Sequence, residues 1–169
     1  MTPSLLITGV YGSGKSSLAE EIAYLLDQRQ DRYALLDLDF LGWASTGEAG
    51  HGAGFRLMLK NLAAMAANYR DSGIDRFVLA YFIRGPEVLD RVRDALGAPL
   101  KVVRLTVPYH AIEQRLASAV TSGRREDDLR EAAASLAASE GVGVEDLVMV
   151  NDRPLGVMAV EVMTWLGWI

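Results

Sequence analysis

Short apolar runs and stretches with helical periodicity alternate along the whole chain. Each apolar run holds four to six residues and is rich in aliphatic, β-branched or aromatic side chains. Runs of this kind are typical of parallel strands that are covered on both faces. The predicted strands are Leu5–Thr8, Tyr33–Leu38, Phe77–Phe82, Val102–Val107 and Leu147–Val150.

Between these runs, apolar residues recur at every third or fourth position, as they do on the buried face of a helix. Pro86 and Gly97 flank one such stretch as start and stop signals. The alternation predicts an α/β fold in which helices cover both faces of one parallel sheet. The predicted helices are Leu18–Leu26, Phe55–Tyr69, Val88–Leu96, Ile112–Val120, an alanine-rich stretch that ends at Glu140, and Met158–Trp165.

Size and composition predict one soluble domain over residues 1–169. Half of the residues are apolar and 23% are charged, and no linker divides the chain. The net charge of −5 argues against a dedicated nucleic-acid surface. The absence of cysteine excludes disulfides, thiolate metal sites and a cysteine nucleophile.

The two ends of the sequence give no sign of a membrane segment. The start lacks the basic region and the long apolar core of a signal peptide. The apolar stretch Leu155–Ile169 is interrupted by Glu161 and is too short to span a bilayer. We therefore expect a cytoplasmic protein without a membrane partner, while its oligomeric state stays open.

The segment Gly9–Ser16 fits the phosphate-binding pattern G-x-x-x-x-G-K-[ST], the Walker A motif, without a mismatch. In this pattern glycines turn backbone N–H groups toward the phosphates, Lys15 reaches the β and γ oxygens, and the Ser16 hydroxyl can hold Mg²⁺. The alternative is a plain glycine-rich turn with a surface lysine, but a strand precedes the segment and a helix follows it, which favours nucleotide binding. The predicted nucleotide-binding residues of this loop are Gly12, Ser13, Gly14, Lys15, Ser16 and Ser17.

Two carboxylates, Asp37 and Asp39, come at the end of the second predicted strand. In an open parallel sheet, ligands bind beyond the carboxyl ends of the strands, where the phosphate loop also lies. Asp37 is the first candidate to accept the proton of an attacking hydroxyl or to orient Mg²⁺, and Asp39 is a candidate to contact the metal or the acceptor. The alternative is a solvated strand end.

Arginines mark two further regions. The charged segment 122–131 predicts a lid in which Arg124 closes over the transferred phosphoryl group, and Arg115 is a weaker candidate for contact with the phosphates or adenine. Arg56 and Arg84 are candidates to bind an anionic acceptor. For all four, the alternative is an ordinary solvated arginine.

Two turns complete the candidate site. The glycine-rich segment 42–54, which contains His51, predicts a flexible flap over the acceptor, or else an ordinary surface loop. The residues Asn151, Arg153 and Pro154 follow the fifth strand and are candidates to lie beside the adenine; the alternative is a polar turn that opens a helix. Tyr81 is expected to belong to the core.

Taken together, these motifs resemble those of the small P-loop kinases of metabolites, the group that contains shikimate kinase, gluconate kinase, adenylylsulfate kinase and chloramphenicol phosphotransferase. GVYGSGKSS is similar to the phosphate loop of the group, DLD to its D-x-D, Phe55-Arg56 to a substrate-binding Phe-Arg, GRREDDLR to its lid and NDRP to its adenine-side turn. The resemblance implies a P-loop NTPase sandwich with strand order 2-3-1-4-5. It also implies Mg-ATP-dependent phosphorylation of a hydroxyl on a small molecule.

The sequence departs from this group on the acceptor side. The third strand ends in Tyr81–Pro86 rather than in a Gly-Gly-Gly turn, and the glycine-rich flap has no counterpart. The acceptor therefore stays open. So do two other functions: a nucleotide-binding or ATPase regulatory module without a small acceptor, and a nucleoside or nucleotide kinase.

Overall fold

Five parallel strands form one sheet in the order β2-β3-β1-β4-β5, as the resemblance implies. The computed structural model describes residues 2–45, 52–108, 110–111, 114, 130, 134 and 143–169. All strand pairs are parallel, and the central strand β1 pairs with β3 on one side and with β4 on the other. The strands are β1 (Ser4–Thr8), β2 (Ala34–Asp37), β3 (Phe77–Ala80), β4 (Leu100–Thr106) and β5 (Leu147–Val150).

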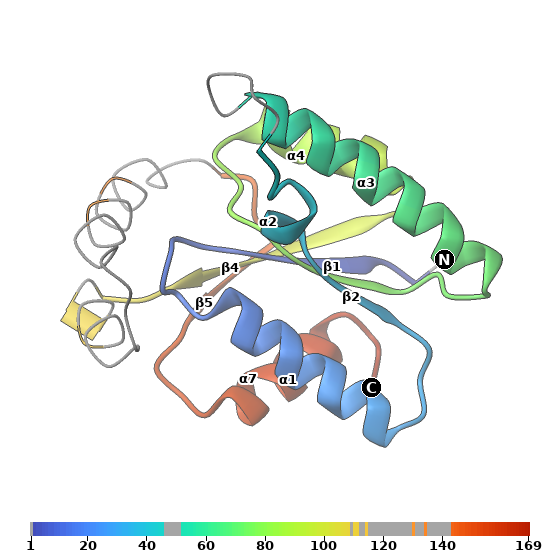
Figure 1. Cartoon of the computed structure of the whole chain (residues 1–169). Coiled ribbons are helices and arrows are strands. Elements are labelled where there is room, and N and C mark those ends of the chain that lie inside the picture. The colour runs from blue at the N-terminus through green and yellow to red at the C-terminus, as the bar shows by residue number, and fades with distance from the viewer. Residues whose placement is uncertain are drawn as a thin grey trace.

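Helices cover both faces of the sheet, which confirms the predicted three layers (Figure 1). On one face α1 and α7 pack against the sheet, and on the other face α3 and α4 do so. Each face has its own buried apolar cluster, so every central strand is enclosed by side chains from both layers. The helices are α1 (Lys15–Gln28), α2 (Leu38–Leu41), α3 (Gly52–Asp71), α4 (Pro86–Leu96) and α7 (Leu155–Trp165).

The second strand is shorter than its apolar run predicts. It ends at Asp37 instead of Leu38, because Asp37 is the N-cap of the short helix α2 and accepts a hydrogen bond from the backbone N–H of Asp39 at 3.1 Å. Leu38 is fully buried, so its apolar character serves the core from within a helix. A helix of four residues is too short for periodicity to reveal.

The glycines around α2 and α3 allow close packing. The helix α3 begins at Gly52, so the last part of the predicted flap is helical. A Cβ atom on Gly42 would lie 2.7 Å from the carbonyl oxygen of Gly54, which is closer than real Cβ contacts. Residues 46–51 of the flap, including His51, lie outside the described residues, as do most of the lid and of the helices predicted over 112–140.

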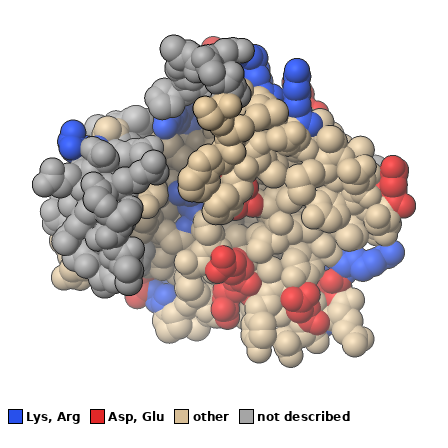
Figure 2. Space-filling model, in the orientation of Figure 1, with Lys and Arg blue, Asp and Glu red and all other residues tan. Residues whose placement is uncertain are grey.

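No helix among the described residues has the length and apolar character that crossing a bilayer requires. On the face drawn in Figure 2, the described part of the surface carries small groups of both positive and negative side chains. Neither sign dominates that part of the surface, in keeping with the modest net charge of −5.

Candidate nucleotide and acceptor site

The loop between β1 and α1 has the backbone conformation that its glycines predict. Gly9 has φ 149°, and Gly14 has φ 97° at the N-cap of α1. A Cβ atom on Gly9 would lie 2.6 Å from the carbonyl oxygen of Leu105, so a side chain there would clash with β4. The backbone N–H of Ser13 donates to the carbonyl of Val10 at 3.1 Å, which closes the turn. The loop thus leads directly into the N-terminus of α1, a position that favours phosphate.

A side chain from the far end of the sequence holds this loop in place. The amide nitrogen of Asn151, just after β5, donates to the carbonyl oxygen of Ser13 at 2.7 Å. Both residues are buried. In a trans peptide the C=O and the following N–H point in opposite directions. Because the Ser13 carbonyl points toward Asn151, the N–H of Gly14 points away from Asn151.

Lys15 and Ser16 occupy the first turn of α1, at the open end of the loop. The Lys15 ammonium donates to the carbonyl oxygen of Val10 at 3.2 Å, so its charge lies across the loop. The Ser16 hydroxyl donates to Oδ2 of Asp37 at 2.7 Å. Residues 21 positions apart, on α1 and at the end of β2, therefore meet through this hydrogen bond, as the strand-end argument predicts.

Asp37 links the loop to the neighbouring strand end through both of its oxygens. Oδ2 accepts from Ser16, and Oδ1 accepts from the backbone N–H of Asp39. Asp37 is half-buried, whereas Asp39 is exposed. The two carboxylates of the D-L-D motif therefore occupy different environments: the Asp37 side chain is held between α1 and α2, and the Asp39 side chain lies at the surface.

Tyr81 lies at the end of the next strand over, within electrostatic reach of Asp39 and Arg84. Burial raises the pKa of the Tyr81 phenol above its usual value; the Asp39 carboxylate raises it further, while Arg84 opposes the rise. Tyr81 also packs against the apolar cluster of the α3/α4 face, as its expected core position suggests. Its hydroxyl end, however, shares its surroundings with two candidate acceptor residues.

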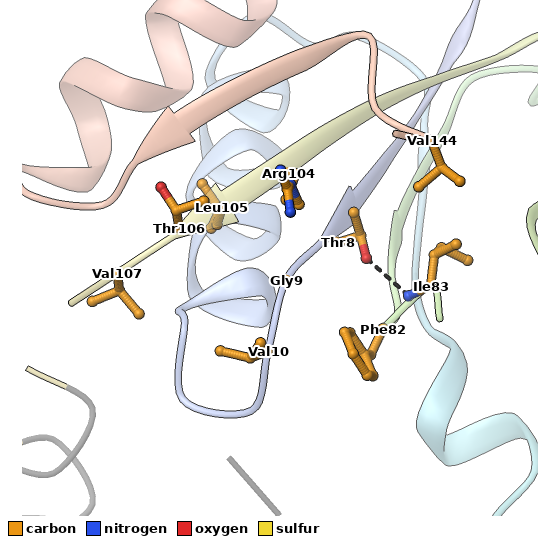
Figure 3. Close-up of a pocket in the computed structure, with 10 residues that line it drawn as sticks. All are labelled: Thr8, Gly9, Val10, Phe82, Ile83, Arg104, Leu105, Thr106, Val107 and Val144. Carbon is orange, nitrogen blue, oxygen red and sulfur yellow. Dashed lines mark hydrogen bonds between the residues drawn. The ribbon is translucent and has the colours of Figure 1, made fainter. Parts of the chain in front are cut away.

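A cleft opens beside the loop at the carboxyl ends of β1, β3 and β4 (Figure 3). Most of its wall is apolar, from Val10, Phe82, Ile83, Val107 and Val144. The Thr8 hydroxyl accepts a hydrogen bond from the backbone N–H of Ile83 at 2.9 Å, which fixes the chain after β3 against β1 (Figure 3).

The charged group in the wall of this cleft is Arg104 of β4. Its guanidinium forms an ion pair with Glu145 at 2.9 Å, and both side chains are mostly buried. The negative charge of Glu145 balances the positive charge of Arg104, so the wall of the cleft is apolar apart from this ion pair and a few polar groups.

Solved structures match this fold over nearly its whole length, although no protein-family model and no curated protein matches the sequence. A gluconokinase from Sinorhizobium meliloti 1021 is 20% identical, with a TM-score of 0.68; the match covers 99% of this chain and 93% of that one. The APS kinase of Mycobacterium tuberculosis, solved with AMPPNP and APS, is 23% identical over 98% of each chain, with a TM-score of 0.64. A shikimate kinase from Bacteroides thetaiotaomicron is 18% identical over 99% of each chain, with a TM-score of 0.67.

This chain has the small P-loop kinase fold. Identities at this level relate folds, and the acceptor differs among the three matched enzymes as they are named. The comparisons therefore identify the fold of this chain and not a ligand.

Three predicted arginines have the following surroundings. Arg56 is exposed in the first turns of α3, and Arg84 is exposed after β3 with its guanidinium 5.6 Å from the Phe82 ring centre. Arg153 forms ion pairs with Glu161 at 2.8 Å and with Asp152 at 3.4 Å.

The remaining predicted residues are placed as follows. Pro154 is exposed at the N-cap of α7, and Ser17 is exposed in the first turn of α1. Arg115 and Arg124 lie outside the described residues, so their predicted roles stay predictions.

Sequence reasoning missed two features of this P-loop kinase fold. It placed Asn151 beside the adenine, a role that remains a prediction, but did not foresee the hydrogen bond to Ser13. It also overlooked Phe40 and Trp43, which are 65% and 74% exposed next to the D-L-D motif. The signal was available, because two large aromatic residues within a polar, glycine-rich stretch are unusual for a surface loop.

The oxygen atoms of Ser16 and Asp37 fit a magnesium ion. A hydroxyl and a carboxylate, 2.7 Å apart at the open end of the loop, are hard oxygen ligands of the kind that Mg²⁺ takes. Within the described part of the chain, no group of three or more His, Cys, Asp or Glu side chains could hold a metal ion. Mg²⁺ in nucleotide sites is usually held by one or two carboxylates together with phosphates and water.

Proposed function

We propose that this protein is an ATP-dependent phosphotransferase that moves the γ-phosphoryl group of Mg-ATP to a hydroxyl group of a small molecule. The observation that carries the proposal is the Ser16–Asp37 hydrogen bond of 2.7 Å, because it joins the phosphate loop to the strand end where an acceptor would lie. The fold supports it, as does the APS kinase whose structure holds AMPPNP and APS.

The chemistry needs little covalent help from the protein. The acceptor oxygen forms a bond to the γ-phosphorus, the bond from that phosphorus to the β–γ bridging oxygen breaks, and ADP leaves. A bound Mg²⁺ would neutralise charge on the phosphates. Lys15 would reach the β and γ oxygens once its contact with the Val10 carbonyl is exchanged.

The two carboxylates have different proposed roles. Both oxygens of Asp37 accept hydrogen bonds, which suits a residue that orients the metal together with Ser16. Asp39 is exposed and lies near Tyr81, so it is the better placed of the two to contact the acceptor and to receive its proton. Arg124 would close over the phosphoryl group from the predicted lid. The soluble, cytoplasmic setting also remains our expectation.

The test is ADP release from Mg-ATP in the presence of a panel of hydroxyl compounds, with ATP affinity measured separately by calorimetry. Lys15→Ala should lower kcat at least about a hundredfold, because a phosphate-stabilising charge is lost. Lys60→Ala removes an exposed lysine from α3 and should leave the rate unchanged. Asp37→Asn should suppress transfer while ATP binding persists.

Two outcomes would contradict the proposal. Full transfer by Asp37→Asn would remove Asp37 from the mechanism. Tight ATP binding without ADP release for any hydroxyl compound would instead favour the nucleotide-binding module.

A further inference from the structure

Two large aromatic side chains are open to solvent beside the proposed acceptor position. Phe40 is 65% exposed and Trp43 is 74% exposed. Their rings stack on each other, with centroids 5.7 Å apart and planes inclined by 20°. Proteins seldom leave large aromatic faces together in water unless a ligand or partner covers them. This pair is called the aromatic platform below.

The aromatic platform sits on an anchored segment. The side-chain amide of Asn61 in α3 donates to the carbonyl oxygen of Leu41 at 2.7 Å, which ties the end of α2 to α3. Gly42 and Gly54 let the same two segments approach closely. Leu38, at the start of α2, is fully buried. The backbone that carries both rings is therefore fixed before any ligand arrives.

The platform is also continuous with the proposed reaction centre. Phe40 directly follows Asp39, and the capping carboxylate of α2 is Asp37, which is bonded to Ser16 of the phosphate loop. The chain after β3 gives Phe82 and Ile83 to the wall of the neighbouring cleft. Aromatic or aliphatic side chains thus follow two strand ends near the loop, Phe40 and Trp43 after β2 and Phe82 and Ile83 after β3.

We infer that the acceptor is a hydroxyl compound with a planar aromatic ring, and that this ring binds on the Phe40–Trp43 platform. The inference rests on the proposed function and names the substrate class for that same site. A ring that stacks on an exposed aromatic face removes apolar surface from water and gains the geometry that aromatic pairs prefer. A polyol or a small sugar acid offers neither gain.

The test compares 3-phenyl-1-propanol with 3-cyclohexyl-1-propanol, which has a similar size and the same hydroxyl group but no planar ring. Binding to the full-length protein saturated with ADP is measured by calorimetry, so that no turnover is needed. We expect the phenyl compound to bind at least about tenfold more tightly, in line with the strength of aromatic stacking.

Variants locate the preference. Phe40→Ala and Trp43→Ala should each remove most of the preference for the phenyl compound. The double variant with Phe40→Leu and Trp43→Leu should also remove it, although it retains an apolar surface. Tyr24→Ala is the matched control, because Tyr24 is an aromatic residue on α1 that is 56% exposed and is not part of the platform. Circular dichroism and melting temperature confirm that each variant folds.

The results separate this inference from the proposed function. Equal binding of the two alcohols, or a phenyl preference that survives in the platform variants, overturns the inference. Phosphorylation of gluconate or glycerol without any phenyl preference retains the kinase and rejects the aromatic acceptor. A phenyl preference that depends on the platform, without ADP release from any alcohol, retains the ring site and rejects the kinase.

Discussion

Removing the hydrogen bond from Asn151 to Ser13 should lower both the stability of the fold and its affinity for ATP. Asn151→Leu keeps nearly the same side-chain shape and removes the donor. The carbonyl of the buried residue Ser13 then loses the hydrogen bond that Asn151 donates to it at 2.7 Å. Leaving a buried acceptor without its donor costs about 1–3 kcal/mol. For a chain of this size, that corresponds to a fall in melting temperature of about 2–12 °C.

Nucleotide binding should weaken as well, for a separate reason. The direction of the Ser13 carbonyl fixes the opposite direction of the Gly14 N–H, which the Walker A pattern predicts to donate to phosphate. If the peptide turns freely, one charge-assisted hydrogen bond of about 1.5–3 kcal/mol is weakened or lost. We therefore expect ATP affinity to fall about tenfold to a hundredfold.

Differential scanning fluorimetry and calorimetric titration with ATP measure the two effects independently. Asp152→Ala is the control, since it changes the next residue, whose side chain is exposed. A lower melting temperature with unchanged ATP affinity would refute the argument about peptide direction. An unchanged melting temperature would refute the claim that this bond stabilises the fold.

Two further predictions concern stability. Gly9→Ala should lower the free energy of unfolding, measured by urea titration, by several kcal/mol, because position 9 has a φ of 149° and an added Cβ would lie 2.6 Å from the Leu105 carbonyl oxygen. Gly85→Ala is the control and should have little effect, because Gly85 is extended and no atom lies within 4 Å of an added Cβ. Burial raises the pKa of the Asp146 carboxyl. Hydrogen bonds from Lys101 and from the Val102 N–H, together with the charges of Lys101 and Arg93, lower it by more, so the pKa lies below its usual 3.8. A lowered pKa in the folded state contributes stability above the unfolded value of about 3.9 and loses it as pH falls through the folded value. Asp146→Asn should therefore cost about 1 kcal/mol at pH 7 and progressively less below about pH 4, and a constant difference across that range would contradict the assignment.

The strands of the sheet and the position of the phosphate loop could be predicted from the sequence because they depend on local patterns of residues. Apolar runs flanked by periodic helices marked all five strands, and the Walker A motif placed Lys15 and Ser16 at the start of a helix. Parallel strands bring their carboxyl ends to one edge, so the meeting of Ser16 and Asp37 could be anticipated.

Other features could not be predicted because they depend on contacts that neither periodicity nor a motif indicates. Nothing near Asn151 indicates that its amide reaches Ser13. The capping of α2 by Asp37 hides within an apolar run that resembles a longer strand. The stacking of Phe40 on Trp43 follows from a helix of only four residues, which periodicity cannot detect.

The Asn151–Ser13 bond also fixes the stage of synthesis at which the phosphate loop can reach its final form. The residue that holds the phosphate loop in place is added 138 positions after Ser13. The central strand β1 likewise waits for β3 and β4 before it has neighbours on either side. At about 5–20 residues per second, the delay between Ser13 and Asn151 is roughly 7–28 seconds. During that interval the nascent chain carries a complete Walker A motif without the hydrogen bond from Asn151, so we expect any stabilisation by ATP to be weaker before this residue is added.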